Sequence, residues 1–553
     1  MNPSSFRRTT RVRSRFLTRR ATMRGIAAGG LSTAVARAVG LDQVRAAAES
    51  DAATPVATPG LQATLSDATL RAFEADAEAA LQTFRVPGAA VALVQGNEIV
   101  FNRGFGLRDL ASGAPVTPRT RFRIGSITKS MTVLLLATLV DDGVLSWDDR
   151  VVDLWSEFAA PTPELTQTLR VRDLLGMASG IAESTDLSVA AAEFFMSAGT
   201  ISASDVLRSV ATLPVIAPPD MTFSYNNMLY AAAAYVGLLA QGTPSESLEE
   251  SYAAQVQQRV FEPIGMADAA ILDDPRPLGD DFAVGYTPDI FGDPSPLPFV
   301  SIAGIAPAGS GLASATDMAR YLMTQMHRGL APGGARAVST TNLAEMHRPG
   351  IPVEAAGLFP PELPSDTVAL NYCMGWLSET YRDSRQLLWH SGGIDGFSAL
   401  MGFFPQEQLG FAFLTNVGRG GGLFNLSLQA SLLGRLFGLN RELPGFLAGA
   451  IPEMEARTAE LAARTGPVDP ASVTHYLGLY EDGFRLRMDD AGVLFLDHDI
   501  RSMPLLALSD GSYVVAAGPD VVLEQPVTFD VDDFGVPIMS ITGFAPVRWL
   551  TGG

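Results

Sequence analysis

The chain of 553 residues contains a single lysine, Lys129, whereas every other member of its basic count of 39 is arginine. A guanidinium stays protonated in proteins, but an ammonium can lose its proton when it is buried. Residues 131–140 form an apolar run directly after this lysine, and the run ends at Asp141-Asp142-Gly143, which predicts a buried helix with a glycine stop. We therefore expect a buried helix in this region, with the single lysine of the chain at its start.

Ser126 lies three residues before Lys129. Positions i and i+3 share one face of a helix, and the positive N-terminal end of a helix favours a negative charge that develops on the serine oxygen. A neutral amine beside a hydroxyl is the arrangement of an activated nucleophile that attacks a carbonyl carbon. The alternative is a surface lysine that follows a serine by chance, and the spacing alone does not exclude it.

A second polar cluster, Tyr225 and Asn227, precedes the small-residue run 230–239, which predicts another helix. A phenol beside an ammonium can relay a proton, and an amide can orient the lysine or bind a substrate carbonyl. Taken alone, the motif is weak, because a tyrosine in such a position is more often a packing residue whose hydroxyl is satisfied.

A third cluster contains His390, Ser391, Gly392 and Gly393 and leads into two predicted strands, 398–404 and 409–415. Glycines in a strand let a substrate backbone approach closely, and the N–H of Gly393 can join the N–H of Ser126 in an oxyanion hole. A lone histidine is usually structural, and His390 alone has that interpretation.

Composition restricts the class of protein. Hydrophobic residues make up 47% and charged residues 18% of the chain, which predicts a large core and more than one domain. The net charge of −20 argues against nucleic-acid binding, and no apolar run is long enough to span a bilayer. Cys373 is the single cysteine, and the five histidines lack zinc-site spacing, so we expect no disulfide, metal or cofactor. The oligomeric state stays open.

Residues 1–48 differ from the rest of the chain because they hold ten arginines and one acid, Asp42, which leaves 29 of 39 basic and 58 of 59 acidic residues for the remainder. Arg19-Arg20 precedes the weakly apolar stretch 25–36, and Ala46-Ala47-Ala48 offers a small-residue cleavage site. The segment resembles a twin-arginine signal peptide, which predicts an exported protein, periplasmic or extracellular. A basic extension on a cytoplasmic protein is the alternative.

The remaining chain divides into four predicted parts. Residues 49–64 read as a linker, 65–440 as the catalytic domain, 441–469 as a linker with a short charged helix at 453–464, and 470–553 as a small antiparallel β domain. Further predicted elements are a helix with Leu70, Phe73, Ala77 and Leu81 at helical spacing, a hairpin of strands 89–94 and 99–105, a flexible glycine-rich connection at 418–422, a helix at 423–437, and strands at 484–488, 493–496, 513–515 and 521–523. A helix and antiparallel strands before the lysine helix favour an α+β fold over alternating βαβ units.

Ser126-x-x-Lys129, then Tyr225-x-Asn227 and then His390-x-Gly392 follow one another in an order that resembles the serine β-lactamase and penicillin-binding-protein superfamily. The resemblance extends from about residue 65 to 439 and is to the class C-like branch of serine peptidases, D-aminopeptidases, DD-carboxypeptidases and family VIII esterases. Residues 122–125, 144–149, 174–181, 263–266 and 309–314 also resemble family segments, and 476–480 resembles the opening of a lipocalin-like appendage. This implies an antiparallel sheet flanked by helices, an all-helical subdomain and a small β domain.

The resemblance implies Ser126 as the acylated nucleophile, Lys129 as the general base, Tyr225 as the proton shuttle, and Asn227 as the residue that holds Lys129 and the substrate. The implied reaction is acyl transfer from a small-molecule or peptide substrate to Ser126, followed by attack of water on the acyl-enzyme. A non-catalytic binding or sensor protein that retains the fold is an alternative.

The same resemblance implies that His390, Ser391 and Gly392 lie on a strand that lines the site, with Gly393 in the oxyanion hole. His390 stands where true class C β-lactamases carry lysine, which favours the peptidase and esterase branches over a penicillin-hydrolysing β-lactamase. Met177 stands where relatives commonly have histidine. The choice among ester, D-amino acid peptide and β-lactam substrates is left open, and turn-rich residues 182–219 and 272–302 are expected to determine it.

Overall fold

The computed structural model describes residues 65–183, 201–353, 366–439, 443–518, 526–532, 534–541 and 546–551. The predicted signal peptide, the predicted linker 49–64 and the predicted strand 521–523 lie outside these residues. Within the described ranges, no helix is both long and apolar enough to cross a membrane.

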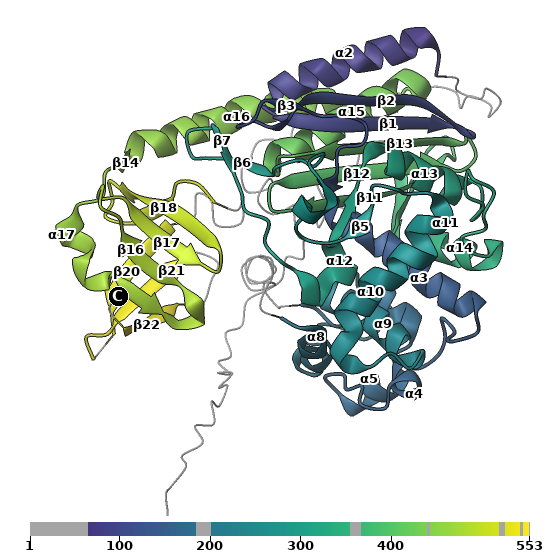
Figure 1. Cartoon of the computed structure of the whole chain (residues 1–553), viewed down its shortest axis with the longest axis horizontal. Helices are drawn as coiled ribbons and strands as arrows, with labels where there is room; N and C mark the ends of the chain where they lie inside the picture. Colours follow the sequence, from purple (N-terminus) through teal and green to yellow (C-terminus); the bar gives the residue numbers. More distant parts are fainter. Residues whose placement is uncertain are drawn as a thin grey trace, which may run out of the picture.

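An eight-stranded antiparallel sheet is the centre of the described part of the chain before residue 440, in the order β3-β2-β1-β13-β12-β11-β10-β9 (Figure 1). The strands are β1 (Gly88–Gln95), β2 (Glu98–Asp109), β3 (Ala114–Pro115), β9 (Thr367–Tyr372), β10 (Leu377–Tyr381), β11 (Gln386–Ile394), β12 (Phe397–Phe404) and β13 (Leu409–Thr415). The hairpins β1–β2 and β12–β13 were predicted from the sequence. Sequence-distant β1 and β13 are neighbours in the sheet, with Val91 opposite Phe413.

Both faces of the central strands are buried. Alternate residues of β1 belong to two cores. Ala90 and Val94 pack with the helices around the lysine, whereas Val91 and Leu93 pack on the other face with helices α2 (Asp67–Thr83) and α15 (Arg419–Phe437). Side chains alternate between the faces of a strand, so an apolar run without polar interruptions indicates a strand covered on both sides.

Helices cover the two faces and form a helical subdomain beside the sheet (Figure 1). These helices are α2 (Asp67–Thr83), α3 (Thr128–Asp141), α4 (Val151–Leu154), α5 (Pro163–Thr168), α6 (Val171–Leu175), α8 (Ala203–Ser209), α9 (Asn227–Ala240), α10 (Leu248–Val256), α11 (Glu262–Ile264), α12 (Ala306–Gly309), α13 (Ala315–Met326), α14 (Thr340–His347) and α15 (Arg419–Phe437). Short strands β4 (Phe122–Arg123), β5 (Ala270–Ile271) and β8 (Gly311–Ala313) form a second sheet, and β6 (Tyr286–Pro288) pairs with β7 (Pro294–Pro296).

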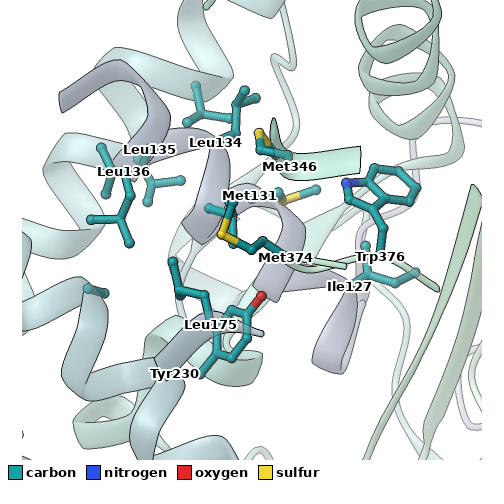
Figure 2. Packing of buried hydrophobic residues seen from close by; sticks show 14 of the residues in the cluster. Ile127, Met131, Leu134, Leu135, Leu136, Leu175, Tyr230, Met346, Met374 and Trp376 are labelled. Carbon is teal, nitrogen blue, oxygen red and sulfur yellow. The ribbon is translucent and has the colours of Figure 1, made fainter. Parts of the chain in front are cut away.

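Helix α3 is the buried helix that follows the predicted nucleophile. Every residue from Thr128 to Leu139 is buried, as expected for a helix that is apolar around its whole circumference. Figure 2 shows Met131 of α3 in the core with Leu175, Tyr230 and Trp376, which come from the helical subdomain and the sheet side. Packing on all sides fixes α3 and thereby the side chains at its N-terminal end.

Two predicted boundaries are wrong. The glycine-rich run 418–422 is not a flexible connection, because α15 already begins at Arg419. A Cβ atom on Gly421 would lie 2.1 Å from Thr415 Oγ1, so the glycine lets the first turn of α15 approach β13 closely. The charged helix is also longer than predicted: α16 spans Leu443–Arg464 and includes Pro452. Buried Leu443 and Leu447 in a cluster with α15 residues explain the additional turns.

The C-terminal part is a small antiparallel barrel, in which β18 pairs with both β17 and β19 and closes a ring of eight described strands. Its strands are β15 (Gly478–Tyr480), β16 (Arg485–Met488), β17 (Leu494–His498), β18 (Arg501–Leu508), β19 (Tyr513–Val515), β20 (Pro526–Val531), β21 (Pro537–Ile541) and β22 (Val547–Thr551), with β14 (Thr465–Gly466) paired to β18. Tyr480, Leu486, Leu496, Val515 and Met539 fill its core. The α+β fold class with a separate β domain is thus confirmed, whereas the domain limits stay predictions.

Candidate active site

The predicted nucleophile, Ser126, lies on a short 3₁₀ turn, η2 (Gly125–Ile127), directly before α3. Close backbone contacts hold this turn against β11. A Cβ atom on Gly392 would lie 1.9 Å from the carbonyl oxygen of Ile124, and one on Gly125 would lie 2.6 Å from the Gly393 nitrogen. Gly125 also has a φ of +52°, which glycine adopts without strain. Glycine at these positions lets the β11 backbone lie beside the serine.

Lys129 is fully buried in the first turn of α3. Its Nζ lies 3.0 Å from Ser126 Oγ, 2.7 Å from Asn227 Oδ1 and 2.8 Å from the carbonyl oxygen of Ala308. Burial lowers the pKa of Lys129 to about 7, and the negative charge of Glu183 works in the opposite direction. The amine is therefore neutral in a large fraction of molecules near neutral pH.

The three partners of Lys129 can accept all three N–H groups of its ammonium form, and they also accommodate the neutral amine. Such an amine has two N–H donors and one lone pair. The oxygens of Asn227 and Ala308 can only accept, so they take the two N–H groups. The lone pair is then left for the hydroxyl hydrogen of Ser126. This arrangement allows Lys129 to accept the proton of Ser126.

Tyr225 lies beside the same amine, with its ring centroid 4.8 Å from Lys129 Nζ. Burial raises the pKa of Tyr225 above its usual value, while a hydrogen bond with Ser126 lowers it. The phenol therefore stays protonated near neutral pH, where the amine is already partly neutral. Of these two groups, the amine is the available base and the phenol is an available proton donor.

Asn227 is the first residue of α9, and the preceding Asn226 caps this helix by accepting a hydrogen bond from Leu229 N at 2.9 Å. The backbone N–H of Asn227 donates to Glu183 Oε1 at 2.7 Å, and its side-chain Nδ2 donates to Glu183 Oε2 at 3.3 Å. Glu183 and the Ala308 carbonyl were missed from the sequence. Glu183 could have been noticed as a carboxylate at the end of the apolar segment 174–183. The Ala308 carbonyl could not, because every residue has a main-chain carbonyl.

His390, which was expected on a strand that lines the site, lies on β11. Its ring is buried, with Nδ1 2.6 Å from the Ser391 carbonyl oxygen and Nε2 3.3 Å from the Tyr372 hydroxyl. Because a carbonyl only accepts, Nδ1 donates to it and Nε2 accepts from Tyr372. Burial and the Lys129 charge lower the pKa of His390 to about 4, against the effect of the Ser391 hydrogen bond, so the ring is neutral. It supports Tyr372, whose ring packs edge to face on Tyr225 at 6.4 Å.

The structure thus brings Ser126, Lys129, Tyr225 and Asn227 together, although up to 101 positions separate them in the chain. On β11, the side chain of Ser391 is exposed, in contrast to the buried ring of the preceding histidine.

The C-terminal barrel reaches the loop next to this site. Arg501, the first residue of β18, lies 2.8 Å from Asp395, which follows β11, and the two side chains are 3% and 8% exposed. The buried guanidinium of Arg123 pairs with Asp273 at 3.1 Å and also interacts electrostatically with Asp395. A buried group of charges therefore joins the barrel to the end of the strand that carries Gly393.

The Beta-lactamase family model matches residues 73–431, and the chain belongs to this family. Among its relatives, the unguisins hydrolase ungD of Aspergillus violaceofuscus is 28% identical over 357 residues, which cover 62% of this chain and 60% of that protein. Penicillin-binding protein 4 of Amycolatopsis lactamdurans is 27% identical over 402 residues, or 72% of this chain and 93% of that protein. The chain thus spans about 60% of the length of the fungal relative.

Solved structures with a similar fold include the octameric penicillin-binding protein homologue from Pyrococcus abyssi. The TM-score is 0.57 at 22% identity, and the match covers 86% of this chain and 99% of the other. The structure of SurE matches with a TM-score of 0.52 at 22% identity over 87% of this chain. Both matches extend beyond the family model and establish the likeness in fold.

Proposed function

We propose that this chain is a serine hydrolase that cleaves an ester or amide bond through an acyl-enzyme on Ser126. The observation that carries the proposal is the buried amine of Lys129, whose pKa is lowered to about 7 and which lies 3.0 Å from Ser126 Oγ. A buried, deprotonatable amine beside a hydroxyl has a clear use in nucleophilic catalysis and none in charge pairing, for which the chain uses arginine.

In the proposed first step, Lys129 takes the proton of Ser126 as Oγ attacks the carbonyl carbon. The oxygen of that carbonyl becomes negative and is stabilised by the N–H groups of Ser126 and Gly393. Tyr225 gives its proton to the leaving group and is reprotonated by Lys129. Cleavage of the bond leaves the acyl group on Ser126. Water then attacks the carbonyl carbon of the acyl-enzyme while Lys129 takes its proton, and Lys129 returns that proton to Ser126 Oγ as the acid is released.

The proposed substrates are peptide-like amides or esters, in preference to β-lactams. This choice rests on His390, because a neutral buried ring occupies the position where true class C β-lactamases carry a cation. The names of the relatives, a hydrolase and a penicillin-binding protein, fit this class of reaction. Export by the N-terminal segment remains part of the proposal.

The test is covalent labelling of the purified protein with a fluorophosphonate and, separately, with benzylpenicillin, followed by intact mass measurement and mapping of the adduct. We expect the fluorophosphonate adduct on Ser126, its loss in Ser126→Ala and its retention in Ser112→Ala, which changes an exposed serine. A protein that stays unlabelled would favour the non-catalytic alternative. A stable penicilloyl adduct would indicate a penicillin-binding peptidase, and opened lactam without an adduct would indicate a β-lactamase. p-Nitrophenyl esters and D-amino acid peptides then separate esterase from peptidase.

A further inference from the structure

Glu183 is a partly buried carboxylate that touches none of the reacting atoms, yet it contacts the residue that holds Lys129. We propose that Glu183 is a positioning residue: it holds the side-chain amide of Asn227 with its oxygen toward Lys129 and thereby keeps the lone pair of Lys129 directed at Ser126. This inference rests on the proposed function and adds a residue outside the three motifs.

The contacts of Glu183 determine which way the amide faces. Its Oε1 accepts the backbone N–H groups of Asn227 at 2.7 Å and Met228 at 3.2 Å, and its Oε2 accepts Asn227 Nδ2 at 3.3 Å. The two backbone donors belong to the first turn of α9, where N–H groups lack partners within the helix and favour a negative charge. Burial raises the pKa of Glu183, and the N–H donors and the charge of Lys129 oppose this effect. Because all three contacts are N–H donors, both oxygens of Glu183 act as acceptors, so the NH₂ group of Asn227 has to face Glu183 and its oxygen has to face Lys129.

The opposite orientation of the amide would disable the base. Asn227 Nδ2 would then point at Lys129 and donate to its lone pair, in competition with the hydroxyl of Ser126. One N–H of the amine would also lose its acceptor, since only the Ala308 carbonyl at 2.8 Å would remain. The orientation that Glu183 selects is therefore the one in which Lys129 can accept a proton from Ser126.

Glu183→Gln is the sharpest substitution because it keeps the size of the side chain. The glutamine oxygen can still accept the backbone N–H groups of Asn227 and Met228, but its NH₂ group then faces Asn227 Nδ2. Two donors cannot bond to each other, so the Asn227 amide has to turn and present Nδ2 to Lys129. If the glutamine amide turned instead, its NH₂ group would face the two backbone N–H donors, which makes two unfavourable donor–donor contacts in place of one.

A change of charge accompanies the change of orientation. Four titratable groups lie around Lys129: Glu183 from the segment after α6, the phenol of Tyr225 directly before α9, the phenol of Tyr230 on α9, and the ring of His390 on β11. The negative charge of Glu183 raises the pKa of Lys129. Its removal lowers that pKa further, so the amine stays neutral down to a lower pH. The acid limb of acylation then moves to lower pH, although the maximal rate falls.

The experiment measures the second-order rate of Ser126 labelling by a fluorophosphonate from about pH 5 to 9. For Glu183→Gln we expect a plateau lower by about tenfold or more, with the acid limb moved to lower pH. Glu183→Asp keeps the negative charge, but its shorter side chain cannot contact Asn227 Nδ2. We therefore expect the maximal labelling rate to fall while the pH at which the rate begins to rise stays the same. Glu249→Gln is the matched control, because Glu249 also accepts a helix N-terminal N–H, from Ala203 at 2.6 Å, without a contact to the lysine network. Thermal unfolding checks that each variant is folded.

A double-mutant cycle shows whether Glu183 acts through Asn227. If it does, Glu183→Gln adds little to the loss already caused by Asn227→Ala. Additive losses, an unchanged pH limb in Glu183→Gln, or a wild-type plateau in Glu183→Asp would each overturn the inference while the wild type still labels. A wild-type protein that fails to label at Ser126 would overturn the proposed function itself, and the inference with it. Glu183→Asp keeps the inference open to refutation even if Glu183→Gln does not fold.

Discussion

At the scale of single residues, burial determines which of two neighbouring side chains, an amine or a phenol, can act as the base. Lys129 and Tyr225 both lie next to Ser126. Burial lowers the pKa of Lys129 and raises the pKa of Tyr225, and each shift favours the neutral form of the group. For an amine the neutral form is the base, whereas for a phenol it is the acid. The same physical cause therefore favours opposite roles for the two side chains.

Replacement of Lys129 by methionine tests the role of the amine. Methionine fills a similar volume without a polar group, so the fold is kept while the base is lost. We expect Ser126 labelling to fall by about 10²-fold or more in a variant that still unfolds cooperatively, although Asn227 Oδ1 and the Ala308 carbonyl lose their donor. Labelling at the wild-type rate in a folded variant would show that another group takes the proton.

The pH dependence follows from the lowered pKa of Lys129. Acylation needs the neutral amine, so its rate should rise with pH through an apparent pKa near 7. In the unfolded chain this lysine keeps its proton up to its ordinary, higher pKa. Between these two values the unfolded state binds more protons, so the free energy of unfolding should rise with pH. Urea titrations at several pH values should show this slope reduced in Lys129→Met; an equal slope in both proteins would contradict the assignment.

At the scale of elements, two glycines, Gly125 and Gly392, let the serine turn η2 and strand β11 approach each other. Gly392→Ala would place a Cβ 1.9 Å from the Ile124 carbonyl oxygen, so the turn and the strand have to separate. We expect a loss of stability of about 1–3 kcal/mol and a strongly reduced labelling rate. Gly333→Ala is the control, since no atom lies within 4 Å of its added Cβ. Equal labelling by both variants would mean that this approach does not shape the site.

Local patterns predicted the elements that carry the site. The apolar run 131–140 gave α3, the hairpins gave β1–β2 and β12–β13, and three short motifs indicated residues that the fold brings together. Long-range contacts had no such signal. Glu183 precedes Asn227 by 44 positions, and the start of α16 depends on burial of Leu443 against α15. Strand β18 was missed because serine and proline interrupt its alternation, and pairing with β17 and β19 holds it in the barrel.

At the scale of the whole molecule, a buried ion pair among the described residues connects the barrel with the catalytic part. Asp395 follows Gly393 by two positions, and its carboxylate is 2.8 Å from Arg501 of β18. Both side chains are almost fully buried, so solvent does not screen the pair. The position of the barrel is therefore coupled to the strand end that would supply the oxyanion hole.

Removal of one partner should expose this coupling. Arg501→Met leaves Asp395 buried without its guanidinium partner in the barrel, which should destabilise the protein by about 3–5 kcal/mol and slow Ser126 labelling. Asp395→Asn combined with Arg501→Met removes both charges and should recover much of the stability. Arg464→Met is the control, because its ion pair with Asp510 is 44% and 53% exposed and contributes little. Urea unfolding and the labelling rate provide the two readouts. If Arg501→Met lowers the stability but leaves the labelling rate unchanged, the ion pair stabilises the barrel without affecting the end of β11. If neither changes, other contacts hold the barrel in place.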